Sequence, residues 1–171
     1  PVTAGPRPSY RLHTVDDSGP GGNGDGVLDP GETAILPITL RNTGDANATS
    51  VLARLYSAFP DVLKVYDGAA SYADIAVNAQ QTSAAPHFAV TLEPSATCGQ
   101  WLGANMGIAG SDFEVGSAFT LNIGEYEGDR PSTDTPVTIP KTTTEGVFSF
   151  LNVASSFPIS EVDVTVNIAH A

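Results

Sequence analysis

The stretch TAILPITLRN, residues 33–42, alternates apolar and polar side chains with a period close to two. Its apolar residues fall at Ile35 or Leu36, then at Ile38 and Leu40, as in a strand that turns one face to a core. Similar short segments follow between turn residues, at 49–58, 62–67, 87–93, 112–117 and 118–125. With 13 prolines and 17 glycines in the chain, this pattern predicts an all-β fold, an antiparallel Ig-like β-sandwich.

Three intervening segments are less regular. NTGDANAT, residues 42–49, has the composition of a hairpin connection, because Gly, Asn and Asp accept positive φ. Residues 71–78 are expected to form a crossover at a strand edge. Residues 97–110 are rich in glycine, and the sequence leaves them open as a strand, a loop or a short helical turn.

The segment GGNGDGVLDPGE, residues 21–32, stands directly before the first predicted strand and has the spacing of a calcium-binding loop. Ca²⁺ takes six to eight oxygen ligands, and a twelve-residue loop supplies them from slots 3, 5, 7, 9 and 12, with Gly at slot 6. Slot 1 falls on Gly21, which has no side chain, so we expect Asp16 or Asp17 to supply that ligand. The predicted ligands are Asp16 or Asp17, Asn23, Asp25, the carbonyl of Val27, Asp29 and Glu32.

Other readings of this loop are a solvated acidic turn or a different metal. Mg²⁺ demands octahedral geometry and keeps its waters, and Zn²⁺ prefers Cys and His, which the loop lacks. One segment supplies nearly the whole coordination shell, so the ion is expected to be structural rather than catalytic. It would fix the N-terminal segment to the first strand of the sandwich.

The charge of the chain is strongly negative, with 19 acidic and 7 basic residues and a net charge of −12. Without a Lys/Arg cluster, nucleic acid and anionic membrane are unfavourable partners. No apolar run approaches the ~18–20 residues of a membrane span. Such a composition fits a secreted protein, a halotolerant one, or one whose carboxylates hold metal. The single cysteine, Cys98, allows no disulfide within the chain and is expected to be a small buried residue.

Candidate catalytic residues are few. His13, His87 and His170 lie outside the Gly-x-Ser-x-Gly, His-Glu-x-x-His and Cys-His contexts of known hydrolases. No glycine-rich loop carries the Lys that a phosphate site needs. The sequence therefore predicts a protein that is not an enzyme.

The composition changes after residue 125, where a polar segment rich in Pro and Thr begins. The last segment, ISEVDVTVNIAHA at 159–171, alternates cleanly, but so small a β piece cannot bury enough surface to fold alone. We expect it to pack on the first domain, to pair with another chain, or to be part of a larger domain whose remainder is missing. The predicted divisions are an N-terminal extension at 1–15, the sandwich at 16–125, a linker at 126–140 and a short C-terminal β segment at 141–171.

Two family resemblances follow from these motifs. The run DDSGPGGNGDGVLDPGETAILPITLRNTGDANAT resembles the start of the Ig-like calcium-binding accessory modules of secreted bacterial peptidases. The segments SYADIAVNAQ and EVGSAFTLNIGE are similar to that module as well.

The C-terminal part, VTIPK followed by GVFSFLNVASSFPISEVDVTVNIAHA, resembles the opening part of the P-domain of proprotein convertases, a β jelly roll. The matching positions are Ile159, Val162, Val164, Val166, Ile168 and His170. The family continues through further strands, so residues 141–171 would be an incomplete jelly-roll-like piece.

These resemblances imply a secreted, extracellular module that is stabilised by Ca²⁺, has no catalytic role, and serves stability or adhesion beside a parent protease. One alternative is a self-assembling extracellular filament or surface-layer subunit, whose copies pair through the C-terminal strand. Another is a carbohydrate-binding or adhesive module.

Overall fold

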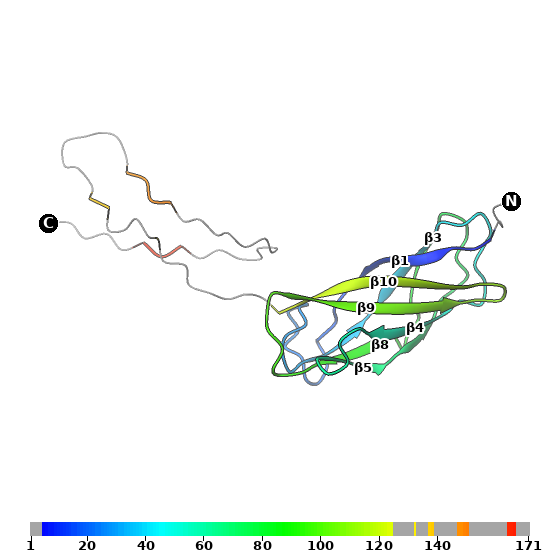
Figure 1. The fold of residues 1–171 in the computed structure, drawn as a ribbon, viewed down its shortest axis with the longest axis horizontal. Coiled ribbons are helices and arrows are strands. Elements are labelled where there is room, and N and C mark those ends of the chain that lie inside the picture. The colour runs from blue at the N-terminus through cyan, green and yellow to red at the C-terminus, as the bar shows by residue number, and fades with distance from the viewer. Residues whose placement is uncertain (1–4, 125–131, 133–136, 139–146, 151–163, 167–171) are drawn as a thin grey trace. The chain divides into compact units, whose positions relative to one another are not determined.

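The computed structural model describes residues 5–124, 132, 137–138, 147–150 and 164–166 of the chain. The chain divides into two compact units, Pro1–Tyr126 and Glu127–Ala171. All strands of the described residues lie in the first unit (Figure 1). In the second unit, the hydroxyl oxygens of Ser132 and Ser149 lie 2.8 Å apart. The predicted linker at 126–140 and most of the predicted jelly-roll-like piece at 141–171 lie outside the described residues.

The first unit is an all-β structure with antiparallel strands, and none of its described residues is helical. The strands are β1 (Pro8–His13), β2 (Thr33–Leu36), β3 (Ile38–Asn42), β4 (Leu52–Ser57), β5 (Leu63–Asp67), β6 (Ala69–Ser71), β7 (Gln80–Thr82), β8 (Phe88–Leu92), β9 (Gln100–Ala109) and β10 (Glu114–Ile123). Among the described residues, no helix has the length and apolar content needed to cross a bilayer.

The strands form two layers. One layer is the sheet β10-β9-β4-β6, and the other combines the sheets β1-β3-β7 and β2-β8-β5. Pro37 alone separates β2 from β3, and it interrupts the ladder because proline has no N–H to donate. The Thr14 amide donates to the Pro37 carbonyl at 3.1 Å, and Asp16 forms an isolated bridge with Ile35. The segment after β1 therefore continues along β2, and the two sheets form one layer.

The core lies between these layers and follows a period of two in β2, β4, β8 and β9. In β2 and β3 the buried apolar residues are Ala34, Leu36, Ile38 and Leu40, so Pro37 breaks the hydrogen bonding but not the alternation of the apolar side chains. Facing them, β9 and β10 pair over ten residues each, from Glu114 opposite Ala109 to Ile123 opposite Gln100. Their buried side chains include Leu102, Ala104, Met106, Ile108, Phe119, Leu121 and Ile123. The prediction of an all-β fold, with antiparallel strands in a β-sandwich, is confirmed.

Most expected strands are confirmed, and the differences fall in β9 and β10. The segments 33–42, 49–58, 62–67 and 87–93 contain β2 with β3, β4, β5 and β8. The segments 112–117 and 118–125 form one strand, β10, instead of two. The undecided segment 97–110 contains β9, where glycines at alternate outward positions hide the strand pattern from a reading based on apolar side chains.

The interpretation of residues 1–15 as an extension is wrong for residues 8–13. These residues form β1, which pairs with β3 from Pro8 opposite Asn42 to His13 opposite Ile38. The Tyr10 ring stacks on Phe119 of β10 at a centroid distance of 4.4 Å. Pro8, Tyr10 and Leu12 alternate with polar residues, but the register with β3 shifts between Tyr10 and Leu12, and Leu12 is 44% exposed. The residues before β1 are rich in proline and glycine, which hides this strand in the sequence.

The expected hairpin at 42–49 is also absent, because β3 and β4 belong to different layers. Asn42 ends β3, is fully buried, and fastens this crossing through both ends of its side-chain amide. Its Nδ2 donates to the carbonyls of Ala46 at 2.8 Å and Ile75 at 3.0 Å. Its Oδ1 accepts from the amides of Arg7 and Gly44, each at 3.0 Å. Every polar group of this buried amide is satisfied, which removes the cost of burying it.

We predict that Phe88→Ala lowers the free energy of unfolding by about 3–5 kcal/mol, because it empties space in a close-packed core. Phe88 is fully buried, whereas Tyr66 on the adjacent strand β5 is 84% exposed. Urea unfolding followed by circular dichroism measures the change, and Tyr66→Ala is the matched control, expected within about 0.5 kcal/mol of the parent. Equal losses in both variants would contradict this core.

Candidate metal centre

The acidic loop is closed at both ends by backbone pairing with β2. The Asp16 amide donates to the Ile35 carbonyl at 2.9 Å, and the Ile35 amide donates back at 2.8 Å. On the other side, the Thr33 amide donates to the Gly21 carbonyl at 3.1 Å. Successive side chains of an extended segment point to opposite sides. Of the pair Asp16 and Asp17, one side chain can therefore face the loop.

Asp17 is the residue that faces the loop. It is 2% exposed, and its carboxylate accepts hydrogen bonds from three consecutive backbone amides. Oδ2 accepts from Gly24 at 2.8 Å and from Asp25 at 3.2 Å, and Oδ1 accepts from Gly26 at 3.0 Å. Gly26 has a φ of 85°, a left-handed conformation that suits glycine, so the loop can curl around the carboxylate.

The pKa of Asp17 reflects two opposing effects. Desolvation by burial raises the pKa of this carboxyl group. Hydrogen bonds from the backbone amides of Gly26, Gly24 and Asp25 lower the pKa, and their combined effect is the larger. The result is a pKa below the ordinary value of 3.8. Asp17 is therefore an anion at neutral pH, as a metal ligand must be.

Asn23, Asp25 and Asp29 meet on the outer side of the loop. The Asn23 Nδ2 donates to Asp25 Oδ2 at 2.9 Å and to Asp29 Oδ2 at 3.3 Å. The Asn23 Oδ1 accepts from the Asp25 amide at 2.9 Å. Asp25 Oδ1 accepts from the Val27 amide at 2.8 Å. An amide NH₂ group thus stands between two carboxylates at the place where the sequence predicts a cation.

The C-terminal half of the loop is anchored in the core. Leu28 is fully buried, and its carbonyl accepts from the Gly124 amide at 2.9 Å, just beyond β10. Glu32 folds back on the turn that precedes β2, where its Oε2 accepts from the Asp29 amide at 3.1 Å and its own amide donates to the Asp29 carbonyl at 3.0 Å. This anchoring holds Asp29 and Glu32 in place without any ion.

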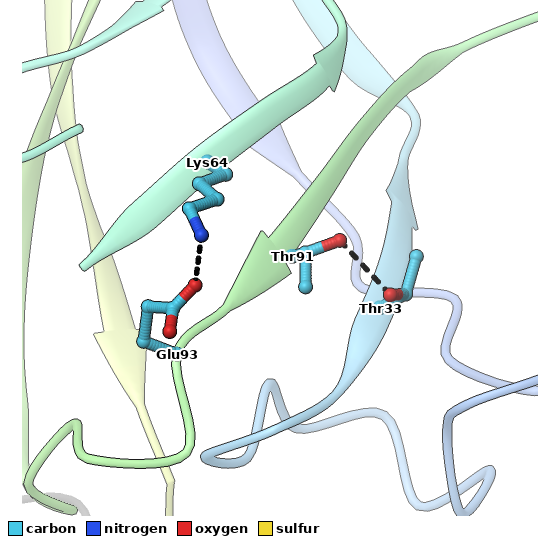
Figure 2. A network of polar contacts seen from close by, with 4 residues as sticks. All are labelled: Thr33, Lys64, Thr91 and Glu93. Atoms are coloured by element: carbon cyan, nitrogen blue, oxygen red, sulfur yellow. Dashed lines mark hydrogen bonds and ion pairs between the residues drawn. The ribbon is translucent and has the colours of Figure 1, made fainter. Parts of the chain in front are cut away.

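Thr33, the first residue of β2, fixes the exit of the loop to the neighbouring strand. The Thr33 hydroxyl lies 2.9 Å from that of Thr91 on β8. Figure 2 shows this contact together with the ion pair of Lys64 and Glu93. Lys64 is 59% exposed, so this pair adds little stability. In the described part of the chain, no Lys or Arg forms an ion pair with Asp17 or Asp25.

The structure brings together some of the predicted ligands and not others. Asn23 contacts both Asp25 and Asp29, and Asp17 accepts hydrogen bonds from the backbone of the same loop. Asp16 is directed elsewhere, because its Oδ1 accepts from the Ser18 hydroxyl at 2.6 Å and the Ser18 amide at 3.2 Å. The sequence could not choose between Asp16 and Asp17, because the choice depends on the pairing of Asp16 with Ile35.

All side chains of this cluster offer oxygen, which suits a hard cation such as Ca²⁺. Among the described residues, no group of three or more His, Cys, Asp and Glu side chains is arranged to hold a metal ion. The nitrogen of Asn23 explains part of this, since it occupies the space between Asp25 and Asp29. A half-turn of that amide would present its oxygen instead, at the expense of the bond from the Asp25 amide.

Two histidines make contacts that the sequence did not indicate. The His87 Nδ1 lies 2.7 Å from the Ser83 Oγ, but Ser83 is 4% exposed and also accepts from the Ile38 amide at 3.2 Å. This hydroxyl holds β3, so its role is structural. The His13 Nδ1 lies 2.8 Å from the Tyr10 hydroxyl, and burial lowers the pKa of His13 below 6.5.

No protein-family model matches the chain, and no curated protein is significantly similar to it.

We predict that Asp17→Asn lowers the melting temperature in the presence of a chelator, whereas Asp16→Asn changes it less. An amide at position 17 keeps one acceptor oxygen and places an NH₂ group against the backbone amides that Asp17 now satisfies. Differential scanning calorimetry in excess EDTA measures the effect without any metal. A larger loss for Asp16→Asn would contradict the assignment of Asp17 to the interior of the loop.

Proposed function

We propose that the chain is a non-catalytic, calcium-stabilised β-sandwich module of a secreted, extracellular protein. The observation that carries this proposal is the buried Asp17 carboxylate within a loop whose Asn23 side chain contacts both Asp25 and Asp29. The carboxylates of Asp25, Asp29 and Glu32 in one short loop repel one another unless hydrogen bonds or a cation offset the repulsion. A Ca²⁺ ion would provide that compensation for the outer residues.

The ligands of this ion would be Asp17, Asn23, Asp25, the Val27 carbonyl, Asp29 and Glu32. When bound, Ca²⁺ would supply charge neutralisation and no chemistry. Because the loop joins the segment after β1 to β2, and because Leu28 bonds to Gly124 beyond β10, the ion would tie the N-terminal strand to both layers. The resemblance to the Ig-like accessory modules of secreted bacterial peptidases supports a stabilising or adhesive role beside a parent protease.

The calcium proposal is tested by thermal unfolding of the full chain, first in EDTA and then over a calcium titration. A ligand that binds the folded state alone stabilises it by mass action, by about 2.7 kcal/mol at one hundred times its dissociation constant. We expect the melting temperature to rise with Ca²⁺ and to rise much less with equimolar Mg²⁺.

The matched variants are Asp25→Asn within the loop and Asp61→Asn outside it. Both remove one negative charge from the chain, but Asp61 lies beyond the loop, after β4. Asp25→Asn should abolish most of the calcium-dependent rise, and Asp61→Asn should retain it. A rise that is the same in both variants would mean that Ca²⁺ acts by general charge screening.

A second candidate function, assembly between copies of the chain, is favoured by the second unit. Its described apolar side chains are largely exposed: Phe148 79%, Phe150 76%, Val164 79% and Val166 68%. Within each pair the residues are two apart, as on one face of a strand. Exposed apolar stripes of this kind mark surfaces that pair with another chain. A filament or surface-layer subunit would use them in that way.

We predict that the mass of the full chain, measured by light scattering after gel filtration, rises with concentration if copies assemble through this stripe. Replacing Val164 and Val166 together by Lys should keep the chain monomeric, because a desolvated lysine opposes pairing. The control replaces the exposed Tyr66 of β5 by Lys. A monomer at every concentration would rule out assembly through this stripe.

A further inference from the structure

The outward side chains of β4, β9 and β10 form a nearly uncharged surface on an acidic protein; we call it the β9 face. The alternation of each strand directs one set of residues into the core and the other set to this face. Of its outward positions, Arg54 and Glu114 are charged, and their charges cancel. The chain as a whole has a net charge of −12, so its acidic residues lie elsewhere.

Three aromatic side chains lie along this face. Trp101, Tyr56 and Phe59 are 55%, 54% and 49% exposed. A Cβ built on Gly103 would lie 3.8 Å from the Phe59 ring, and one built on Gly107 would lie 3.9 Å from the Tyr56 ring. The Phe59 and Tyr56 rings therefore lie over the outward side of Gly103 and Gly107, at a distance where a Cβ would make ordinary van der Waals contact, and about half of each side chain is exposed to solvent.

Polar groups stand beside each ring, as the strand register shows. Asn122 is opposite Trp101, Thr120 is opposite Gly103, and Asn105 is opposite Tyr56. From residue 101 to residue 107, β9 extends over about 20 Å. The β9 face thus alternates flat apolar platforms with amide and hydroxyl groups along one strand.

The charge and the side chains of the β9 face determine which class of ligand it can bind. One arginine cannot hold the phosphates of a nucleic acid. A second copy of the chain would bring another twelve negative charges close, and the small Gly and Ala residues between the rings offer it few protruding side chains to interlock with. A neutral pyranose sugar fits, because its C–H face is apolar and stacks on aromatic rings while its hydroxyls exchange hydrogen bonds with amides.

We propose that the β9 face binds a neutral, β-linked polysaccharide whose chain lies along β9. Aromatic rings provide most of the binding energy, and Asn105, Thr120 and Asn122 orient the sugar hydroxyls. The proposal goes beyond the calcium loop and does not require it, since none of these residues belongs to residues 17–32.

Trp101 is the only tryptophan of the chain, so intrinsic tryptophan fluorescence reports on this face directly. The experiment titrates the full-length chain with cellohexaose and with chitohexaose, and measures depletion of the protein by microcrystalline cellulose and by chitin. We expect a saturable change in fluorescence with at least one oligosaccharide, and depletion by the polymer of the same sugar.

The variants separate this face from general stickiness. Tyr56→Ala should weaken binding about tenfold, because it removes one stacking platform, and Trp101→Phe should weaken depletion while preserving the fold. Tyr66→Ala, which removes a more exposed tyrosine from β5 in the other layer, should bind as the parent does.

Any of three results would overturn the proposal. One is the absence of fluorescence change and depletion with both sugars. Another is a Tyr56→Ala variant that keeps parental affinity. If Tyr56→Ala instead lowers the mass of an oligomer in light scattering, the face is a contact between copies and the proposal is wrong.

Discussion

The first unit depends on one interaction at its N-terminal end, the acceptance of three backbone hydrogen bonds by the carboxylate of Asp17. Hydrogen bonds to a charged acceptor are stronger than those between neutral groups, and here they come from Gly24, Asp25 and Gly26 in succession. They set the curvature of the loop. That curvature in turn brings Asn23, Asp25 and Asp29 together and places Leu28 in the core. The loop is therefore ordered around an anion within the protein, and a cation would act on the side that faces solvent.

The two-layer arrangement explains how so small a loop can influence the whole sandwich. The segment after β1 and the strand β2 flank the loop. Strand β1 in turn pairs with β3 and contacts β10. Tyr10, stacked on Phe119, joins the two layers at this edge. Asn42 performs a similar task at the opposite end of β3, through four hydrogen bonds of one buried amide. The hydrogen bonds of Asp17 and Asn42 thus fix two places in the layer that contains β1, β2 and β3, in addition to the apolar core between the layers.

The sequence predicts the strands whose burial is local in origin and misses those whose burial is not. In β4 and β8 one face is buried and the other exposed or partly exposed, so alternation of apolar residues reveals them. In β9 the outward positions include Gly103 and Gly107, which have no side chain and so give no apolar or polar signal, although the rings of Phe59 and Tyr56 lie over them. In β1 the sequence alternates through Pro8, Tyr10 and Leu12 but the burial does not, since the register with β3 shifts between Tyr10 and Leu12 and Leu12 is 44% exposed.

The same limit applies to the candidate site. Spacing alone placed Asn23, Asp25 and Asp29 in one cluster, because their positions are set by the loop itself. The choice of Asp17 over Asp16 depends on the pairing of Asp16 with Ile35, which is a tertiary contact. The aromatic rings on the β9 face come from two segments of the chain, 56–59 and 101, and their joint position follows from strand register. No local motif records it.

The most direct test of the calcium-stabilised sandwich is a crystal structure of the full chain grown with millimolar Ca²⁺, with anomalous data to identify the ion. The account predicts one calcium peak in the loop, at about 2.3–2.6 Å from oxygens of Asp17, Asp25 and Asp29, with the Asn23 oxygen turned toward it. A loop without a peak, in which the Asn23 nitrogen still bridges Asp25 and Asp29, would contradict it.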